Sequence, residues 1–309
     1  MTKKTKRQYR IRNWTQYNKA LVARGSLTLW IDDRSLETWL SADSRVGRGR
    51  PHLYADAAIL CSLLLREVYH LPLRATQGLI SSVLRLMQLS FPVPHYSTLS
   101  RRARSLAVPL SAQASKGPRH LVIDATGLKL YGEGEWRVRS KGWTKRRTWR
   151  KLHLSMDGDT QQLTSVLITN RDVVDPRGLP RLLKEIQGPI ERVTADGAYD
   201  SRECYRAIAE RGARAVIPPR KGSTMWEDHY LQDRNSNLRG VHRFGVKGWK
   251  KKSGYHRRSL VETAMFRLKT IFTDKLRSRE VKRQRTEARI RCAALNQMTE
   301  LGMPESYPI

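Results

Sequence analysis

The sequence predicts a helical N-terminal region followed by a mixed α/β sheet with helices packed on it. Apolar residues between positions 54 and 89 repeat at the spacing of amphipathic helices. Beyond about residue 117 the pattern changes to short strand-like runs separated by helical stretches. The order of three strands, helix, strand, helix, strand and helix describes a mixed sheet. We therefore expect a helical domain over residues 1–116 and an α/β domain over residues 117–309.

Three helices are expected in the N-terminal region. The first covers residues 54–69, and the second follows Pro72, which suits a first helical turn. After the break "SFPVPHY", Ser97 could cap a third, short helix. The basic residues of that helix are Arg101, Arg102 and Arg104. Two helices, a tight break and a basic helix resemble a DNA-reading helix-turn-helix group, and a helical bundle with a solvated basic face is the alternative.

The second domain is expected to contain five strands. Gly117 and Pro118 precede the first strand, and the turn residues Gly158 and Asp159 join the second and third into a hairpin. The expected segments are strands 120–132, 148–157, 161–169, 190–197 and 214–219, and helices 176–187, 200–212, one around Glu262 and one over 281–301. Asp200 followed by Glu203 fits a capping box. Residues from about 220 to 253 lack periodicity and should form a long loop or inserted subdomain.

The charge indicates a polyanionic partner. The chain of 309 residues has 59 Lys and Arg against 28 Asp and Glu, a net charge of +31. Nucleic acid is the first candidate, because neutralised phosphates release counterions. A ribosomal or chromatin-packing protein would share the charge, but typically without eight Trp in so long a chain. The acid-free stretches 137–151 and 243–258 interleave bases with aromatics, which suits phosphate tracking and base stacking.

Cysteine use and hydropathy indicate a cytoplasmic protein. The three cysteines, Cys61, Cys204 and Cys292, form no CxxC pair, so neither structural zinc nor a disulfide framework is expected. The basic N-terminus lacks the apolar core of a signal peptide. No stretch approaches the roughly 18 apolar residues of a membrane span.

Two aspartates, Asp124 and Asp196, lie within or directly after predicted strands, where a carboxylate is unusual. Asp124 shares one face of its strand with Val122 and Thr126, and a buried carboxylate is costly unless it is paired, hydrogen-bonded or bound to metal. Asp196 follows a short strand, at the end where ligand sites of open α/β sheets gather. A satisfied structural role is the alternative for Asp124. Asp157 and Asp159 are interpreted as turn residues.

Glu262 is a lone acid in a basic stretch. At about 100° per residue, Tyr255, Arg258 and Lys269 fall within roughly 40° of Glu262 on one helix face. The apolar residues that would pack on the sheet are Leu260, Val261, Ala264, Leu268 and Ile271. An exposed stripe with an ordinary Arg258–Glu262 pair is the alternative. Asp124, Asp196 and Glu262 together could hold two divalent cations roughly 4 Å apart, and Mg²⁺ prefers a few carboxylates plus phosphate oxygens.

The whole pattern resembles bacterial insertion-sequence transposases of the DDE type, in the insertion-sequence-5 family and its 903-like group. The resemblance spans nearly the whole chain, through "HLVIDATGLK", "WRKLHL", "ADGAYD" and "IPPR". Its most specific signature is Tyr, two residues, Arg, three residues, Glu, six residues, Lys. Tyr255, Arg258, Glu262 and Lys269 match that signature without a gap.

This resemblance implies an RNase H-like catalytic domain in which Asp124, Asp196 and Glu262 bind two Mg²⁺ or Mn²⁺ ions. It implies an N-terminal domain that binds the terminal inverted repeats, hydrolysis at the element ends, and transfer of the 3′-hydroxyls into double-stranded target DNA. Tyr255, Arg258 and Lys269 would contact DNA near the scissile phosphate. A homo-oligomer on DNA, associated with the bacterial nucleoid, is also implied.

Some expectations rest on the residues alone. Arg101, Arg102 and Arg104 would read the repeat, and Trp226 and Trp249 could stack on a displaced base, with a core or surface role as the alternative for each tryptophan. Two other functions stay open: a nuclease of the same fold that cuts without joining, and a DNA-binding regulator that has lost catalysis.

Overall fold

The computed structural model describes residues 9–31, 33–41, 52–110, 117–130 and 149–309, and all structural statements refer to these ranges. Most of the basic stretch 137–151, including Trp143, lies outside the described residues. Within them, no helix is both long enough and apolar enough to cross a membrane.

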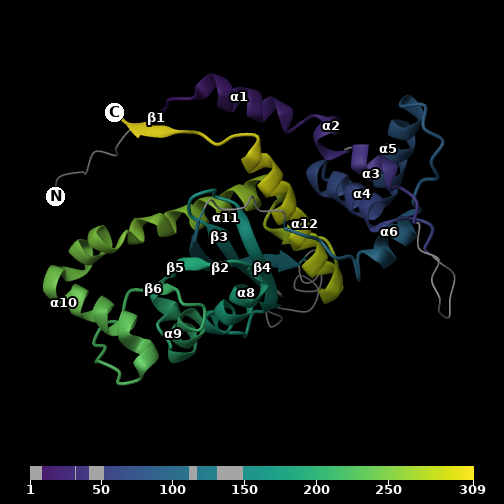
Figure 1. Cartoon of the computed structure of the whole chain (residues 1–309). Helices are drawn as coiled ribbons and strands as arrows, with labels where there is room; N and C mark the ends of the chain where they lie inside the picture. Colours follow the sequence, from purple (N-terminus) through teal and green to yellow (C-terminus); the bar gives the residue numbers. More distant parts are fainter. Residues whose placement is uncertain (1–8, 32, 42–51, 111–116, 131–148) are drawn as a thin grey trace, which may run out of the picture.

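A six-stranded mixed sheet forms the centre of the molecule (Figure 1). Its strands are β2 (Arg119–Leu130), β3 (Trp149–Asp157), β4 (Leu163–Asn170), β5 (Ile190–Thr194), β6 (Arg214–Val216) and β7 (Lys275–Leu276). The order is β4-β3-β2-β5-β6, with β7 paired to the end of β2. The β2–β3 and β3–β4 pairs are antiparallel, whereas β5 runs parallel to β2 and β6 parallel to β5. This is an RNase H-like arrangement, and the mixed α/β prediction is confirmed.

The predicted β3–β4 hairpin is confirmed, including its turn chemistry. Asp157 Oδ1 accepts from the backbone N–H of Asp159 at 2.8 Å and of Thr160 at 3.3 Å. A carboxylate that caps its own turn in this way fixes the direction of the following chain.

Helices cover both faces of the sheet, as the alternation along β2 requires. Leu121 and Ile123 face the cluster of α8 (Leu179–Glu185) and α9 (Arg202–Ala209), and Val122 and Leu128 face the opposite cluster. That opposite face carries α11 (Ser259–Phe272) and α12 (Val281–Glu300). The predicted packing of α11 is confirmed: Val261, Ala264 and Leu268 are buried, with Leu260 and Ile271 partly buried against the same cluster.

The N-terminal region is helical, as predicted. Its helices are α1 (Trp14–Ala23), α2 (Leu27–Trp30), α3 (Asp33–Glu37), α4 (Asp56–Val68), α5 (Leu73–Leu86) and α6 (Tyr96–Arg102). Pro72 is the N-cap of α5 and precedes its first turn. The expectation that Ser97 caps α6 is wrong, because α6 begins at Tyr96 and the ring of His95 accepts from the Ser97 N–H. A two-stranded sheet of β1 (Tyr9–Ile11) and β8 (Ser306–Pro308) joins the two ends of the chain.

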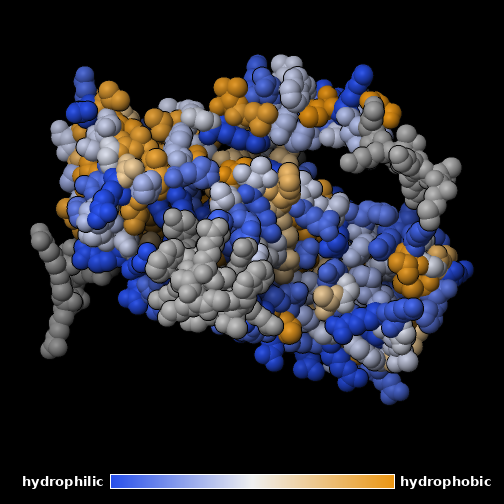
Figure 2. Space-filling model, turned by 180° about the vertical axis from the view of Figure 1, so that it is seen from behind, coloured by the Kyte–Doolittle hydropathy of each residue, from blue (hydrophilic) through white to orange (hydrophobic). Residues whose placement is uncertain are grey.

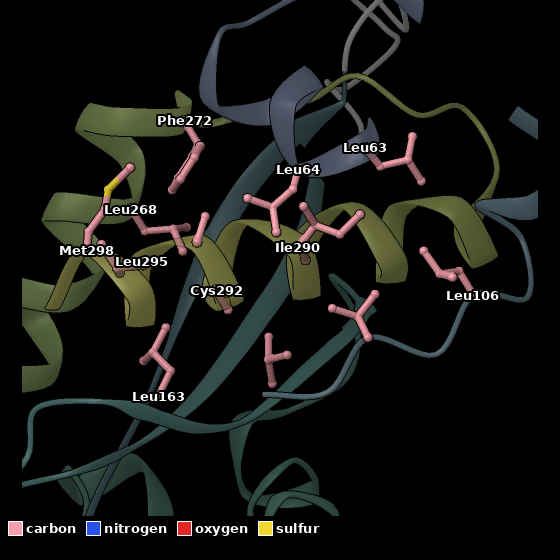
Figure 3. Packing of buried hydrophobic residues seen from close by; sticks show 14 of the residues in the cluster. Leu63, Leu64, Leu106, Leu163, Leu268, Phe272, Ile290, Cys292, Leu295 and Met298 are labelled. Atoms are coloured by element: carbon pink, nitrogen blue, oxygen red, sulfur yellow. The ribbon is translucent and has the colours of Figure 1, made fainter. Parts of the chain in front are cut away.

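Helix α12 connects the N-terminal helices to the sheet. Ile290, Cys292, Leu295 and Met298 lie between α4 on one side and the sheet on the other (Figure 3). One hydrophobic cluster therefore runs from the N-terminal helices to the sheet. The division at residue 116 stays a prediction.

A buried ion cluster strengthens the contact between α4 and α12. Arg291 Nε donates to Glu67 Oε2 at 2.8 Å, and Arg291 also donates to Glu287 at 2.5 Å. Arg277 approaches Glu67 Oε1 at 2.8 Å. Burial would raise the pKa of Glu67, but Arg291, Arg66 and Arg277 hold that pKa below its ordinary value. The carboxylate therefore stays ionised while completely buried.

The structure corrects two local predictions. Asp200 does not cap α9, because Ser201 Oγ accepts from Cys204 N–H while Asp200 turns inward to Arg234 Nε at 3.1 Å. The stretch expected to be a long loop or an inserted subdomain, about 220 to 253, contains the 22-residue α10 (Gln232–Ser253), so it is not a long loop. Its three internal glycines and its scarcity of apolar residues obscure the helical period of the sequence. The non-helical Gly245 interrupts that period further.

Candidate active site

Two aspartates come together because two parallel strands end in register. Val122 of β2 pairs with Thr194 of β5, so Asp124 and Asp196 each lie two residues beyond this pair, at the same level of the sheet. Asp124 is partly buried within β2, and its Oδ1 accepts from its neighbour's N–H, that of Ala125, at 2.8 Å. Asp196 caps the short 3₁₀ helix η2 (Gly197–Tyr199) by accepting from Ala198 N–H at 2.8 Å. Their backbone positions are therefore fixed.

Glu262 reaches the same place from α11. It lies in the first turn of that helix, and its side chain is half exposed. Arg258, one turn earlier, connects it to β2: Nη1 donates to Asp124 Oδ2 at 2.9 Å and Nη2 donates to Glu262 Oε1. One guanidinium therefore joins the strand carboxylate to the helix carboxylate.

The three carboxylates influence one another electrostatically. Burial raises the pKa of Asp124, and the negative charges of Asp196 and Glu262 raise it further, against the Ala125 hydrogen bond and Arg258, which lower it. Burial would lower the pKa of Arg258, but Tyr255 and the three carboxylates raise it. A carboxylate whose pKa is raised by two neighbouring carboxylates belongs to a site whose charge a divalent cation would relieve.

The donor set fits magnesium, yet its geometry is not that of a bound ion. Among the described residues, no group of three or more His, Cys, Asp or Glu side chains is close enough to hold a metal. The guanidinium of Arg258 lies between two of the three carboxylates and partly neutralises them. Mg²⁺ prefers oxygen ligands and retains positions for substrate oxygens. The three carboxylates could supply such ligands once Arg258 moves away from Asp124 or Glu262.

The remaining signature residues differ in position from the single stripe that was predicted. Lys269 Nζ donates to Thr126 Oγ1 at 2.6 Å, on the strand face that also carries Asp124. Tyr255 is not on α11. It belongs to the 3₁₀ helix η4 (Tyr255–Arg258), which follows the left-handed Gly254, and its ring is buried 5.5 Å from the ring of Trp249. Burial raises the pKa of Tyr255 to about 12; the charge of Arg258 lowers this pKa, and the charges of Asp196, Asp124 and Glu262 raise it.

The base-stacking expectation for Trp249 is wrong. Only 4% of its surface is exposed, and Nε1 donates to Asn237 Oδ1 at 3.3 Å. Its neighbours Val216 and Tyr255 complete a small buried cluster, so Trp249 is a core residue. Trp226 is partly buried and stacks on Arg234, whose guanidinium carbon lies 3.5 Å from the ring centre.

The three arginines predicted on the third helix differ in their availability, and Arg104 lies beyond the end of α6 at Arg102. Arg102 donates to the carbonyl of Tyr54 at 2.8 Å and pairs with Asp56. Arg104 donates to Glu280 at 2.6 Å. Arg101 is exposed and makes a long contact of 3.4 Å with Thr98. Arg101 is therefore the best placed of the three to meet a partner.

An anchoring network behind η4 was not predicted. Arg257 Nη1 donates to His120 Nδ1 at 3.1 Å and Nη2 donates to Asp159 at 2.5 Å. Burial, assisted by Arg257 and Arg192, lowers the pKa of His120 to about 4, so the ring is neutral. It can then accept from Arg257 and donate to Thr194 Oγ1, 2.8 Å from Nε2. The only signal in the sequence was the run "HRR" before Glu262, in which Arg257 holds η4 in place and Arg258 contacts the carboxylates.

The mixed sheet with carboxylates at its centre is the arrangement of an RNase H-like domain with an acidic site. Sequence comparison identifies the family. A domain described as "Transposase DDE domain" matches residues 115–297, and a second domain with the same description matches residues 22–133. The first match covers more than half of the chain, so the protein belongs to the DDE transposases.

Solved structures with partial similarity are also transposases. A piggyBac transposase synaptic complex with hairpin DNA shares 11% identity at a TM-score of 0.42, covering 89% of this chain and 75% of that one. A Drosophila P element transposase strand transfer complex shares 15% identity at 0.31, covering 65% and 45%. A Mos1 transposase paired-end complex shares 11% at 0.24, covering 76% and 82%. All three TM-scores are below 0.5, so the family assignment depends on the sequence match.

Proposed function

We propose that this protein is the transposase of a bacterial insertion sequence, in the insertion-sequence-5 family and its 903-like group. It binds terminal inverted repeats in double-stranded DNA, hydrolyses phosphodiester bonds at the element ends and joins the 3′-hydroxyl ends to target DNA. The observation that carries the proposal is the joining of Asp124 and Glu262 by Arg258, beside Asp196 at the matching level of the neighbouring strand.

Asp124, Asp196 and Glu262 are proposed to hold Mg²⁺ or Mn²⁺, two ions for each site. When bound, such ions activate the attacking oxygen and stabilise the leaving oxygen of the phosphodiester. The protein's contribution is to orient both aspartate carboxylates, Asp124 through the Ala125 N–H group and Asp196 through the Ala198 N–H group. Glu262 is half exposed, which leaves it free to adjust its position.

Arg258 and Lys269 are proposed to contact the phosphates next to the bond that is cleaved. Arg258 already forms two charged contacts at the carboxylates, and release from either one frees a planar, charged donor for a phosphate oxygen. Lys269 adds a second positive charge beside Thr126. Tyr255 is proposed to act at the same place through its hydroxyl, since its ring is held by Trp249.

The N-terminal residues 1–116 are proposed to bind the inverted repeats, with Arg101 as an exposed arginine that, within the described part of the chain, is not paired with a carboxylate. Both element ends must be held during joining, so the proposed active form is a homo-oligomer on DNA. A cytoplasmic, nucleoid-associated location follows from this substrate.

The test incubates the protein with a labelled inverted-repeat end, a target plasmid and Mg²⁺. Cleavage together with a joined product is expected. Cleavage without joining would indicate a nuclease of the same fold. Repeat-specific binding with no chemistry in either Mg²⁺ or Mn²⁺ would reject both enzymatic readings and leave a DNA-binding regulator.

A further inference from the structure

Helix α10 bends back on itself and forms a helical hairpin. Asn237 and Trp249 are twelve residues apart, which would separate them by about 18 Å in a straight helix. Their side chains are instead hydrogen-bonded at 3.3 Å. The bend lies at Gly245, whose φ of 65° and ψ of 167° are not helical. Figure 1 shows α10 at the edge of the molecule, turning back toward α11.

The base of this hairpin is fixed next to the acidic site. Asn237 Nδ2 donates to the backbone carbonyl of Ala215 on β6 at 2.9 Å. Trp249 packs on Gly240 so closely that a Cβ there would lie 2.8 Å from its ring, and it also contacts Tyr255. Tyr255 belongs to the same 3₁₀ helix, η4, as Arg258, whose guanidinium contacts Asp124 and Glu262, so the hairpin base lies near the carboxylates.

The tip of the hairpin, which we name the α10 arm (residues 239–252), is exposed and positively charged. Every residue from 242 to 247 is exposed. Its six Lys and Arg are Arg239, Arg243, Lys247, Lys250, Lys251 and Lys252. No Asp or Glu occurs between positions 234 and 261, and within the described part of the chain none of the six forms an ion pair. In Figure 2 this edge, at the right, is largely hydrophilic.

The concentration of unpaired positive charge on the α10 arm favours the binding of an external anion. Like charges held on one rigid projection repel one another, and an array of phosphates relieves that repulsion by releasing counterions. The arm contains no Asn, Gln, Asp or Glu, the side chains that recognise adenine or cytosine, and its Arg and Lys side chains can contact guanine as well as phosphate. Its composition is suited to phosphates more than to bases.

We propose that the α10 arm binds the phosphate backbone of double-stranded DNA irrespective of sequence, and so holds the duplex beside the carboxylates. This inference rests on the proposed transposase function. Arg243 and Lys252 flank the half-exposed ring of Phe244, at 5.2 and 3.5 Å from its centre, so both charges are carried at the bend itself. At the buried base, Trp249 is held by the hydrogen bond to Asn237 and by ring contact with Tyr255.

The experiment compares two matched double variants of the full-length protein. Arg243→Ala/Lys247→Ala removes one Arg and one Lys from the arm. Arg181→Ala/Lys184→Ala removes the same pair of charges from exposed positions of α8, on the opposite face of the sheet. Fluorescence anisotropy measures the binding of a DNA duplex of arbitrary sequence over a range of salt concentrations.

We expect the arm variant to lower the slope of log affinity against log salt by about 2, since each phosphate contact contributes roughly 0.9. The control should keep the wild-type slope. The same loss is expected on a duplex that carries the inverted repeat. An unchanged slope in the arm variant, an equal fall in the control, or a loss confined to the repeat duplex would overturn the inference.

Cleavage of a labelled element end separates this inference from the proposed function. If the wild-type protein cleaves and the arm variant keeps the full salt slope, only the inference fails. If the wild-type protein does not cleave but the arm variant still has a reduced salt slope, the proposed function fails and the inference about the α10 arm holds.

Discussion

Arg258 Nη1 donates to Asp124 Oδ2 at 2.9 Å, across the gap between α11 and β2. The same guanidinium pairs with Glu262, so a single positive charge occupies the space between two carboxylates. Under the proposed function, a divalent cation would compete with Arg258 for these oxygens, and this competition would have a measurable consequence.

Replacing Arg258 with Ala should increase the affinity of the DNA-free protein for Mn²⁺ several-fold. The variant leaves Asp124 and Glu262 facing each other without a counter-charge, which only the cation can then supply. Isothermal titration calorimetry measures the affinity, and Lys269→Ala serves as the control because Lys269 donates to a hydroxyl. An Arg258→Ala affinity equal to that of the wild type would contradict the competition.

Removing the charge of Glu67 should destabilise the protein strongly. Glu67→Gln leaves the buried Arg291 and the partly buried Arg277 against a neutral amide, and breaking a buried pair costs about 3–5 kcal/mol. Asp172→Asn is the control, since its pair with Arg171 is exposed and should change the free energy of unfolding by less than about 0.5 kcal/mol. Urea unfolding measures both.

The pKa of Glu67 adds a pH dependence to the same prediction. Its folded pKa lies below the ordinary 4.5, so the stabilisation is present above that value and disappears as the pH falls through the folded pKa. Glu67→Gln should therefore lose part of the acid sensitivity of the wild type. Identical acid transitions in the two proteins would refute this assignment.

The buried neutral His120 should make stability fall between pH 6.5 and about 4. Its folded pKa is lowered to about 4, so the unfolded chain binds the extra proton in this window and is favoured as the pH decreases. Each such histidine contributes up to about 1.4 kcal/mol per pH unit. His120→Gln keeps a hydrogen-bonding side chain and should reduce the slope of unfolding free energy against pH. Burial also lowers the pKa of His153 to about 4, and the contribution of that residue remains in the variant. An unchanged slope of unfolding free energy against pH would show that His120 does not titrate as proposed.

Two glycines should respond to the same substitution with opposite signs. A Cβ on Gly178 would lie 2.5 Å from His153 Nδ1, so Gly178→Ala should cost about 1–3 kcal/mol. A Cβ on Gly78, inside α5, would meet nothing within 4 Å, so Gly78→Ala should stabilise by up to about 1 kcal/mol. Thermal unfolding of both variants gives the comparison, and equal effects would contradict the packing described around His153.

Sequence periodicity predicted much of the fold because strands and amphipathic helices bury one face. The alternation along β2 and the apolar side of α11 follow directly from this rule. The fold-back of α10 could not be predicted, because it depends on Asn237 meeting Trp249 across a glycine bend. Asp200 was misread for a similar reason: its partner Arg234 is 34 residues away in sequence, whereas Glu203 is close by.

The candidate site shows the same division. Spacing on a helix correctly related Arg258 to Glu262, and strand alternation put Asp124 and Thr126 on one face. Stacking of aromatics among basic residues predicted a DNA contact for Trp249, whereas the family resemblance implied one for Tyr255. Burial of both rings depends on Val216 from another strand, which local sequence does not reveal.

The most direct test of the central claim replaces each carboxylate with its neutral isostere, in Asp124→Asn, Asp196→Asn and Glu262→Gln. Each variant is assayed for cleavage of a labelled inverted-repeat end in Mg²⁺ and, separately, for binding of that end. We predict that cleavage falls to the background of the assay in all three while end binding remains at the wild-type level. Near wild-type cleavage by Glu262→Gln would contradict the assignment of this site.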